Sequence, residues 1–150
     1  GFVLIVVLIA IVGIIFLGIS LRNNSAEVSQ SQRIASFLSS LSYLTSSCQI
    51  NSNYQDVSDL IRRCSNKEIC DDSRTSCEVL ESILEESMMA SFIVNEESYT
   101  RYYNLSVVDG NVPLIKEIVK GELIGCSRKL YNERVFGSNI VMKLEVCLEE

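Results

Sequence analysis

Six cysteines are the residues of this chain whose type and spacing most clearly promise chemistry. Such a number within about one hundred residues is typical of disulfides formed in an oxidising compartment outside the cytoplasm. Metal binding is the alternative, but Cys64, Cys70 and Cys77 are separated by five and six intervening residues, whereas zinc knuckles have two, and the chain has no His. We therefore expect disulfides, and neither a metal nor a cofactor. The cysteines are Cys48, Cys64, Cys70, Cys77, Cys126 and Cys147.

Catalytic groups are scarce. Without His, nucleophilic catalysis by a Ser-His or Cys-His pair is excluded. Paired carboxylates such as Glu85-Glu86 and Glu96-Glu97 could transfer protons, but they lie in an acidic run over residues 67–97 that has no glycine-rich loop or metal cluster beside it. We expect no catalytic residues and no enzyme. The acidic run itself is either a solvated helix face or a surface that meets basic groups on a neighbouring subunit or collects cations.

The pairing of the cysteines is only weakly constrained, because six cysteines allow fifteen connectivities. We favour Cys126 with Cys147 and Cys48 with Cys77, which leaves Cys64 with Cys70. If Cys126 lies opposite Cys147 in a hairpin, Arg128 lies opposite Glu145 and the turn centres on residues 136–137. The same register places Lys129 and Glu133 on the core face, so a bulge or another partner for Cys147 stays open.

The first twenty-one residues carry no charge. Fifteen of the residues from Phe2 to Ile19 are Phe, Val, Leu or Ile, and a helix of this length is about 31 Å long. That suffices to cross a bilayer or to form the core of a bundle of identical helices. All 13 Lys and Arg and all 19 Asp and Glu follow Leu21, so the net charge of −6 belongs to the remainder, which is therefore a poor ligand for nucleic acid.

Residues 22–31 are polar but contain no Pro or Gly, so nothing in them forces a helix to stop. Beyond them Ile34, Phe37, Leu38 and Leu41 recur at three- and four-residue spacing, which is the pattern of an amphipathic helix. We therefore expect one long N-terminal helix over residues 1–47, apolar all round in its first half and one-sided in its second.

For the remainder, residues 48–150, we expect a head that disulfides hold together. A second helix is expected to start near residues 71–73 and to end near Phe92, because apolar residues recur at helical spacing between them. Alternation over residues 99–107, the Asp109-Gly110 turn and alternation over residues 140–148 predict an antiparallel sheet. The expected fold class is α+β, with the long helix packed on this head.

This layout resembles that of a type IV pilin. The residues that carry the resemblance are Gly1-Phe2-Val3-Leu4-Ile5, which are similar to the junction where prepilin peptidase removes a short basic leader. Bacterial members usually have a glutamate at the fifth mature position and often a proline near position twenty-two, where this chain has Ile5 or Val6 and Arg22. In lacking both residues the chain resembles the archaeal branch of the family.

The resemblance implies a structural subunit of an extracellular, cell-surface filament that is embedded in the membrane before assembly. Its partners would be further copies of itself, the lipid bilayer, the assembly machinery and prepilin peptidase. Filaments of this kind serve adhesion, motility, DNA uptake or coating, and the sequence singles out none of these. The residues expected in the polymerisation core are Phe2, Leu4, Ile5, Leu8, Ile9, Ile11, Val12, Ile15, Phe16 and Ile19.

The sequence supports two expectations besides the filament core. Asn23 and Asn104 match the N-glycosylation sequon, which fits a surface protein. The alternative function is a bitopic surface protein in which residues 1–21 only anchor a ligand-binding or adhesive ectodomain. An anchor needs nothing beyond Arg22, whereas a filament subunit needs residues 34–44 packed on the sheet of the head.

Overall fold

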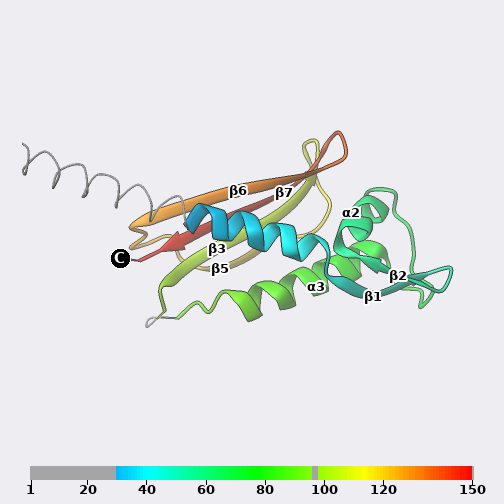
Figure 1. The fold of residues 1–150 in the computed structure, drawn as a ribbon, viewed down its shortest axis with the longest axis horizontal. Coiled ribbons are helices and arrows are strands. Elements are labelled where there is room, and N and C mark those ends of the chain that lie inside the picture. The colour runs from blue at the N-terminus through cyan, green and yellow to red at the C-terminus, as the bar shows by residue number, and fades with distance from the viewer. Residues whose placement is uncertain (1–29, 96–97, 150) are drawn as a thin grey trace, which may run out of the picture. The chain divides into compact units, whose positions relative to one another are not determined.

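A computed structural model of the chain describes residues 30–95 and 98–149. The chain divides into two compact units, residues 1–33 and residues 34–150. The second unit contains every labelled helix and strand and the whole core (Figure 1).

The described helices are short, and the prediction of one long N-terminal helix is wrong. One helix occupies residues 30–42, and it is followed by α2 (Val57–Ser65) and α3 (Ser76–Ser91). Residues 1–29 lie outside the described residues. The helix ends at residue 42 because the N–H groups of Tyr43 and Leu44 turn back to carbonyls only three residues earlier, and the chain then enters a strand over residues that we expected to be helical.

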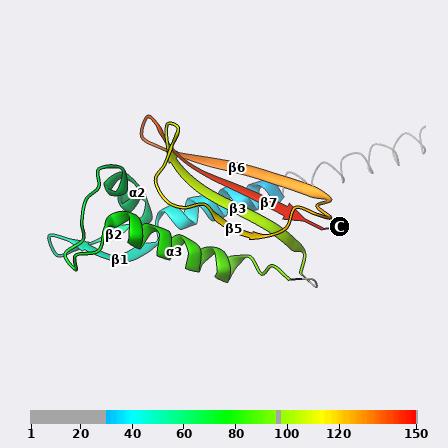
Figure 2. The same ribbon diagram turned by 180° about the vertical axis from the view of Figure 1, so that it is seen from behind.

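The head contains antiparallel sheet, as expected, and its seven described strands form two sheets (Figures 1 and 2). The small sheet pairs β1 (Thr45–Ile50) with β2 (Asn53–Asp56). The larger one has the order β4-β3-β7-β6, with β5 paired to the same edge of β3 as β4. Its strands are β3 (Thr100–Asp109), β4 (Val112–Pro113), β5 (Ile118–Gly121), β6 (Arg128–Phe136) and β7 (Ile140–Leu148).

The register of β6 on β7 differs from the expected one by three residues. Lys129 lies opposite Cys147 and Tyr131 lies opposite Glu145, whereas Cys126 precedes the strand. In this register Leu130 and Phe136 fall on the core face beside Val146 and Ile140, and both are buried. Burial of this apolar pair therefore sets the register, and Lys129 and Glu133 are left exposed as their charges require.

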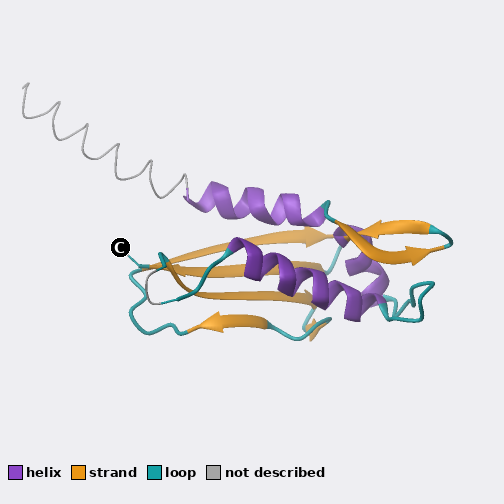
Figure 3. Cartoon of the chain, turned by 90° about the horizontal axis from the view of Figure 1, so that it is seen from below, coloured by secondary structure: helices purple, strands orange, loops and turns teal. Residues whose placement is uncertain are grey.

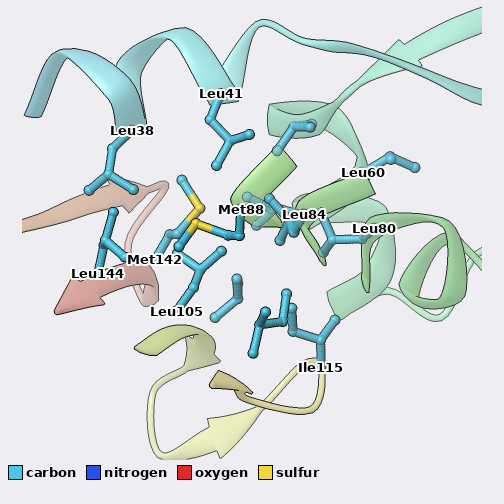
Figure 4. Close-up of a cluster of buried hydrophobic side chains, with 14 of the residues drawn as sticks. Leu38, Leu41, Leu60, Leu80, Leu84, Met88, Leu105, Ile115, Met142 and Leu144 are labelled. Carbon is cyan, nitrogen blue, oxygen red and sulfur yellow. The ribbon is translucent and has the colours of Figure 1, made fainter. Parts of the chain in front are cut away.

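The core lies between one face of the larger sheet and the helices (Figures 3 and 4). Leu38 of the 30–42 helix lies beside Leu144 of β7, and Met88 of α3 lies beside Met142. The Phe37 ring meets the Phe92 ring edge-on at 5.1 Å between centroids, which joins the 30–42 helix to the end of α3. Alternate residues of β7, from Met142 to Leu148, are buried as the sequence predicts.

Side-chain caps fix where α2 and α3 begin. Asp56 accepts a hydrogen bond from the backbone N–H of Asp59 at the start of α2. Thr75 and Glu78 form a reciprocal capping box at the start of α3, a little later than the expected caps at residues 71–73. The caps thereby fix the start of the two helices that carry Cys64 and Cys77.

Candidate assembly surface and disulfide framework

The expected polymerisation-core residues, from Phe2 to Ile19, lie outside the described residues, and so does Asn23. None of the helices that the structure describes has the length and apolar character that crossing a membrane requires. What the structure describes is the head and the disulfides that hold it.

Three disulfides join all six cysteines: Cys48–Cys70, Cys64–Cys77 and Cys126–Cys147. The third pairing is the expected one, and the other two are not, since we expected Cys48 with Cys77. Cys64 lies on α2 and Cys77 on α3, and these two helices pack against each other. Cys48 lies on the strand β1. Helix-on-helix packing, which spacing alone does not reveal, decides this pairing.

The region between Cys48 and Cys77 is held by these bonds and by a carboxylate that the sequence did not single out. Asp71, next to Cys70, accepts hydrogen bonds from the N–H groups of Asn51 and Ser52 in the β1–β2 turn, at 3.2 and 3.0 Å. Both turn residues have positive φ, of 52° and 65°. The Asn-Ser pair between two short polar segments was the available signal for this hairpin.

The Cys126–Cys147 bond fastens a loop to the sheet. Cys126 belongs to the loop between β5 and β6, and Cys147 is a buried residue of β7, with 5.6 Å between their Cα atoms. The backbone N–H of Ser127 also donates to the carbonyl of Leu148 at 3.3 Å. The loop over residues 122–127 is thus attached to the end of β7 both covalently and by hydrogen bonding.

The acidic face of α3 lies partly opposite basic groups of its own chain. Glu81 and Glu85 line a groove of about 570 Å³ together with Lys116 and Lys120 from the segment that contains β5. Tyr103 also lines it, and burial raises the pKa of its hydroxyl, with the Glu85 carboxylate contributing. The charges in the groove balance in part, so this face is less negative than the run of carboxylates in the sequence indicates.

A second groove, of about 280 Å³, runs between the 30–42 helix and α3. Phe37, Leu41 and Leu44 line one side, and small residues of α3, Ser87, Ala90 and Ser91, line the other. Its lining is mostly apolar and carries no charged residue.

Asn104 lies in the middle of the larger sheet. It is a residue of β3 paired to Val119 of β5 on one side and to Glu145 of β7 on the other. Its Nδ2 lies 3.5 Å from a carboxylate oxygen of Glu117, and its Oδ1 is buried with no hydrogen-bond partner among the described residues. Glycosylation at this position stays a prediction, and it would have to occur on a paired strand.

No group of three His, Cys, Asp or Glu residues within ranges 30–95 and 98–149 is arranged to hold a metal ion. Of the paired carboxylates, Glu85 and Glu86 lie on α3, and Glu96 and Glu97 lie outside the described residues. No protein-family profile, curated protein sequence or solved structure is significantly similar to this chain.

Proposed function

We propose that this protein is a structural subunit of an extracellular helical filament of the type IV pilus kind. The observation that carries the proposal is the division of the sequence: residues 1–21 contain no charge, and every Lys, Arg, Asp and Glu follows them. Such a segment has a favourable environment in a bilayer and an equally apolar one in a bundle of copies. The subunit therefore leaves the membrane with little change in the burial of this segment.

Packing of residues 34–41 against the head supports the proposal. From Ile34 onward the polypeptide is fixed to the head, since Ile34, Leu38 and Leu41 are buried in its core. A mere anchor would need only a loose connection at this point. A polymer needs each head to follow the apolar segment of its own subunit, and burial of these side chains would supply the head's end of that connection.

The disulfides support an extracellular location. Three bonds that use every cysteine in the chain are typical of proteins that fold outside the cytoplasm. Contacts that repeat from one copy to the next without closing a ring generate a helical filament with the heads on its surface. In this proposal prepilin peptidase and a pilus-type assembly machinery are partners, and copies of the chain are the main one.

The experiment is to shear cells that express the protein and to examine the released material by negative-stain electron microscopy, with antibodies raised against residues 34–150. Thin filaments decorated along their length support the proposal. Protein that stays dispersed in the membrane fraction, with no labelled filament, would overturn it and would favour the anchored surface protein.

A further inference from the structure

The groove of about 570 Å³ between α3 and the segment that contains β5 has the features of a ligand site. We call it the α3–β5 groove. Its volume is within the range of sites that hold small organic molecules, and it is too large for a single ion. All of its lining residues belong to the compact unit of residues 34–150. The geometry of the groove therefore does not involve residues 1–33.

The two walls of the groove carry opposite charges that do not pair with each other. Glu81 and Glu85 come from successive turns of α3, whereas Lys116 and Lys120 come from the β5 segment. Among the described residues, no carboxylate oxygen lies within 4.0 Å of either lysine Nζ. A ligand with a single charge would be attracted by one wall and repelled by the other. A ligand with both an ammonium group and a carboxylate satisfies both walls.

A buried hydroxyl also opens into the groove. Tyr103 of β3 lines the groove, although the residue is only 1% exposed. Its hydroxyl donates to no acceptor among the described residues and keeps a small opening to the groove. Burial raises the pKa of this hydroxyl, and the Glu85 carboxylate contributes, so the hydroxyl lies near the α3 wall. Because buried polar groups in native proteins are nearly always paired, a ligand here would supply the acceptor that Tyr103 lacks.

The groove follows the backbone of an edge strand. The five consecutive residues from Lys116 to Lys120 all line it. Successive residues of an extended segment point to opposite faces, so a groove that touches all five runs along the backbone and not over one face. Among the described strands β5 pairs with β3 alone, which leaves the peptide groups of its other edge without a strand partner. An extended peptide can pair with such an edge, and this favours a peptide over other zwitterions.

We infer that the α3–β5 groove binds a short zwitterionic peptide, which lies extended along the edge of β5 that faces away from β3. The terminal ammonium group of the peptide binds the carboxylates of α3, and its terminal carboxylate binds the lysines of the β5 segment. Glu117 of the same segment does not oppose this, since its carboxylate lies 3.5 Å from Asn104 Nδ2. Met89 and Ile118 provide apolar contacts for the side chains of the peptide. The inference does not rest on the proposed function, which concerns residues 1–21.

Trialanine and its two blocked forms test this inference. The full chain, labelled with ¹⁵N, is titrated with each peptide in micelles of an uncharged detergent, and the amide chemical shifts are recorded. Trialanine should shift the amides of residues 81–89 and 116–121 in a saturable manner. N-acetyl-trialanine lacks the ammonium group and trialanine amide lacks the carboxylate, so each should bind about three- to tenfold more weakly.

Four variants assign each group of the peptide to its wall. Glu85→Gln should weaken the binding of trialanine but not that of N-acetyl-trialanine, because the acetylated form has no ammonium group to lose. Lys120→Gln should weaken the binding of trialanine but not that of trialanine amide. Tyr103→Phe removes only a hydroxyl and should weaken the binding of all three peptides. Glu86→Gln is the matched control and should change nothing, since Glu86 lies on α3 but outside the groove.

The remaining outcomes each overturn the inference. If trialanine shifts none of these amides up to its solubility limit, or shifts only residues elsewhere, the groove holds no peptide. If all three peptides bind equally, or if only one blocked form binds more weakly, the groove does not recognise both charges. Unchanged amide shifts in β6 and β7 verify that each variant is folded. Filament formation is measured separately, so a failure here leaves the proposed function standing, and a failure there leaves this inference standing.

Discussion

Cys126 is bonded to Cys147, yet the residue that lies opposite Cys147 in the β6–β7 ladder is Lys129. The bond therefore does not cross-link two paired residues of a hairpin. It attaches the loop that precedes β6 to a hairpin whose nine residue pairs are formed independently of it. The bond and the ladder hold different parts of the structure, and they can be separated experimentally.

Replacing both Cys126 and Cys147 by Ala is expected to lower the free energy of unfolding by about 3 kcal/mol, the chain-entropy value for a loop of this size. The hairpin should persist. Amide hydrogen exchange should therefore rise in residues 122–128 and stay slow in β7. The double variant of Cys48 and Cys70 is the matched control, since the sequence separations are 21 and 22 residues.

In that control, exchange should rise in residues 48–53 and 66–75 and leave residues 122–128 unchanged. Loss of protection throughout β6 and β7 in the Cys126 and Cys147 variant would show that the bond, and not the ladder, maintains the hairpin.

The capping box predicts a pH dependence of stability. The Glu78 carboxylate accepts hydrogen bonds from the Thr75 backbone N–H at 2.8 Å and from its hydroxyl at 3.0 Å. These bonds, the backbone one first, lower the pKa of Glu78 below its ordinary value of about 4.5. Because the folded-state pKa is the lower one, the stabilisation is present above about pH 4.5 and is lost as the pH falls through the folded-state pKa.

Glu78→Gln keeps an acceptor at this position but removes its charge. The variant should melt below the wild type at pH 7, and the difference in Tm should vanish at acid pH. Glu81→Gln, on the same helix but outside the capping box, controls for the loss of one carboxylate from α3. An unchanged difference in Tm between Glu78→Gln and the wild type across this pH range would contradict the assigned role of the carboxylate.

Two adjacent methionines of α3 offer a test of the core. Met88 is fully buried between α3 and the larger sheet, whereas Met89 is 49% exposed. Met88→Ala should destabilise the fold by about 2 to 5 kcal/mol, because it leaves a cavity in a packed core. Met89→Ala should change it by no more than about 0.5 kcal/mol. Urea unfolding of both variants with a common m-value provides the comparison, and equal losses would mean that α3 packs on the sheet in another orientation.

The sequence correctly predicted the elements whose own residues carry a clear hydrophobic or turn pattern. In β7, alternation from Met142 to Leu148 shows directly which face is buried. The Asp109-Gly110 turn follows from local chemistry, since Gly110 adopts a φ of 59°. The apolar spacing of Ile34, Leu38 and Leu41 likewise identified the face of the 30–42 helix that enters the core.

The errors arose where tertiary contacts outweigh local pattern. The inward face of β6 carries Asn132 and Arg134 between Leu130 and Phe136, so its alternation is weak. The cysteine pair and one charge pair together suggested a register that the ladder does not have. Arg134 is accommodated there because its guanidinium lies over the rings of Tyr43 and Phe136. Residues 45–50 are rich in Ser and Thr and gave no strand signal, yet β1 forms because Ser46, Cys48 and the paired strand β2 bury it. The expected helix over residues 1–47 failed at its C-terminal end for the same reason, since the residues after 42 enter β1 instead of extending the helix.

Whether residues 1–21 form a filament core is tested by electron microscopy of filaments sheared from cells that express Ile9→Asp, compared with cells that express Ile69→Asp. Ile9 lies in the uncharged segment, where burying a carboxylate costs about 3 kcal/mol or more. Ile69 is exposed in the head, so Asp is tolerated there. We expect filaments from Ile69→Asp and none from Ile9→Asp, with all three disulfides formed in both variants. Filaments of normal number and length from Ile9→Asp would contradict it.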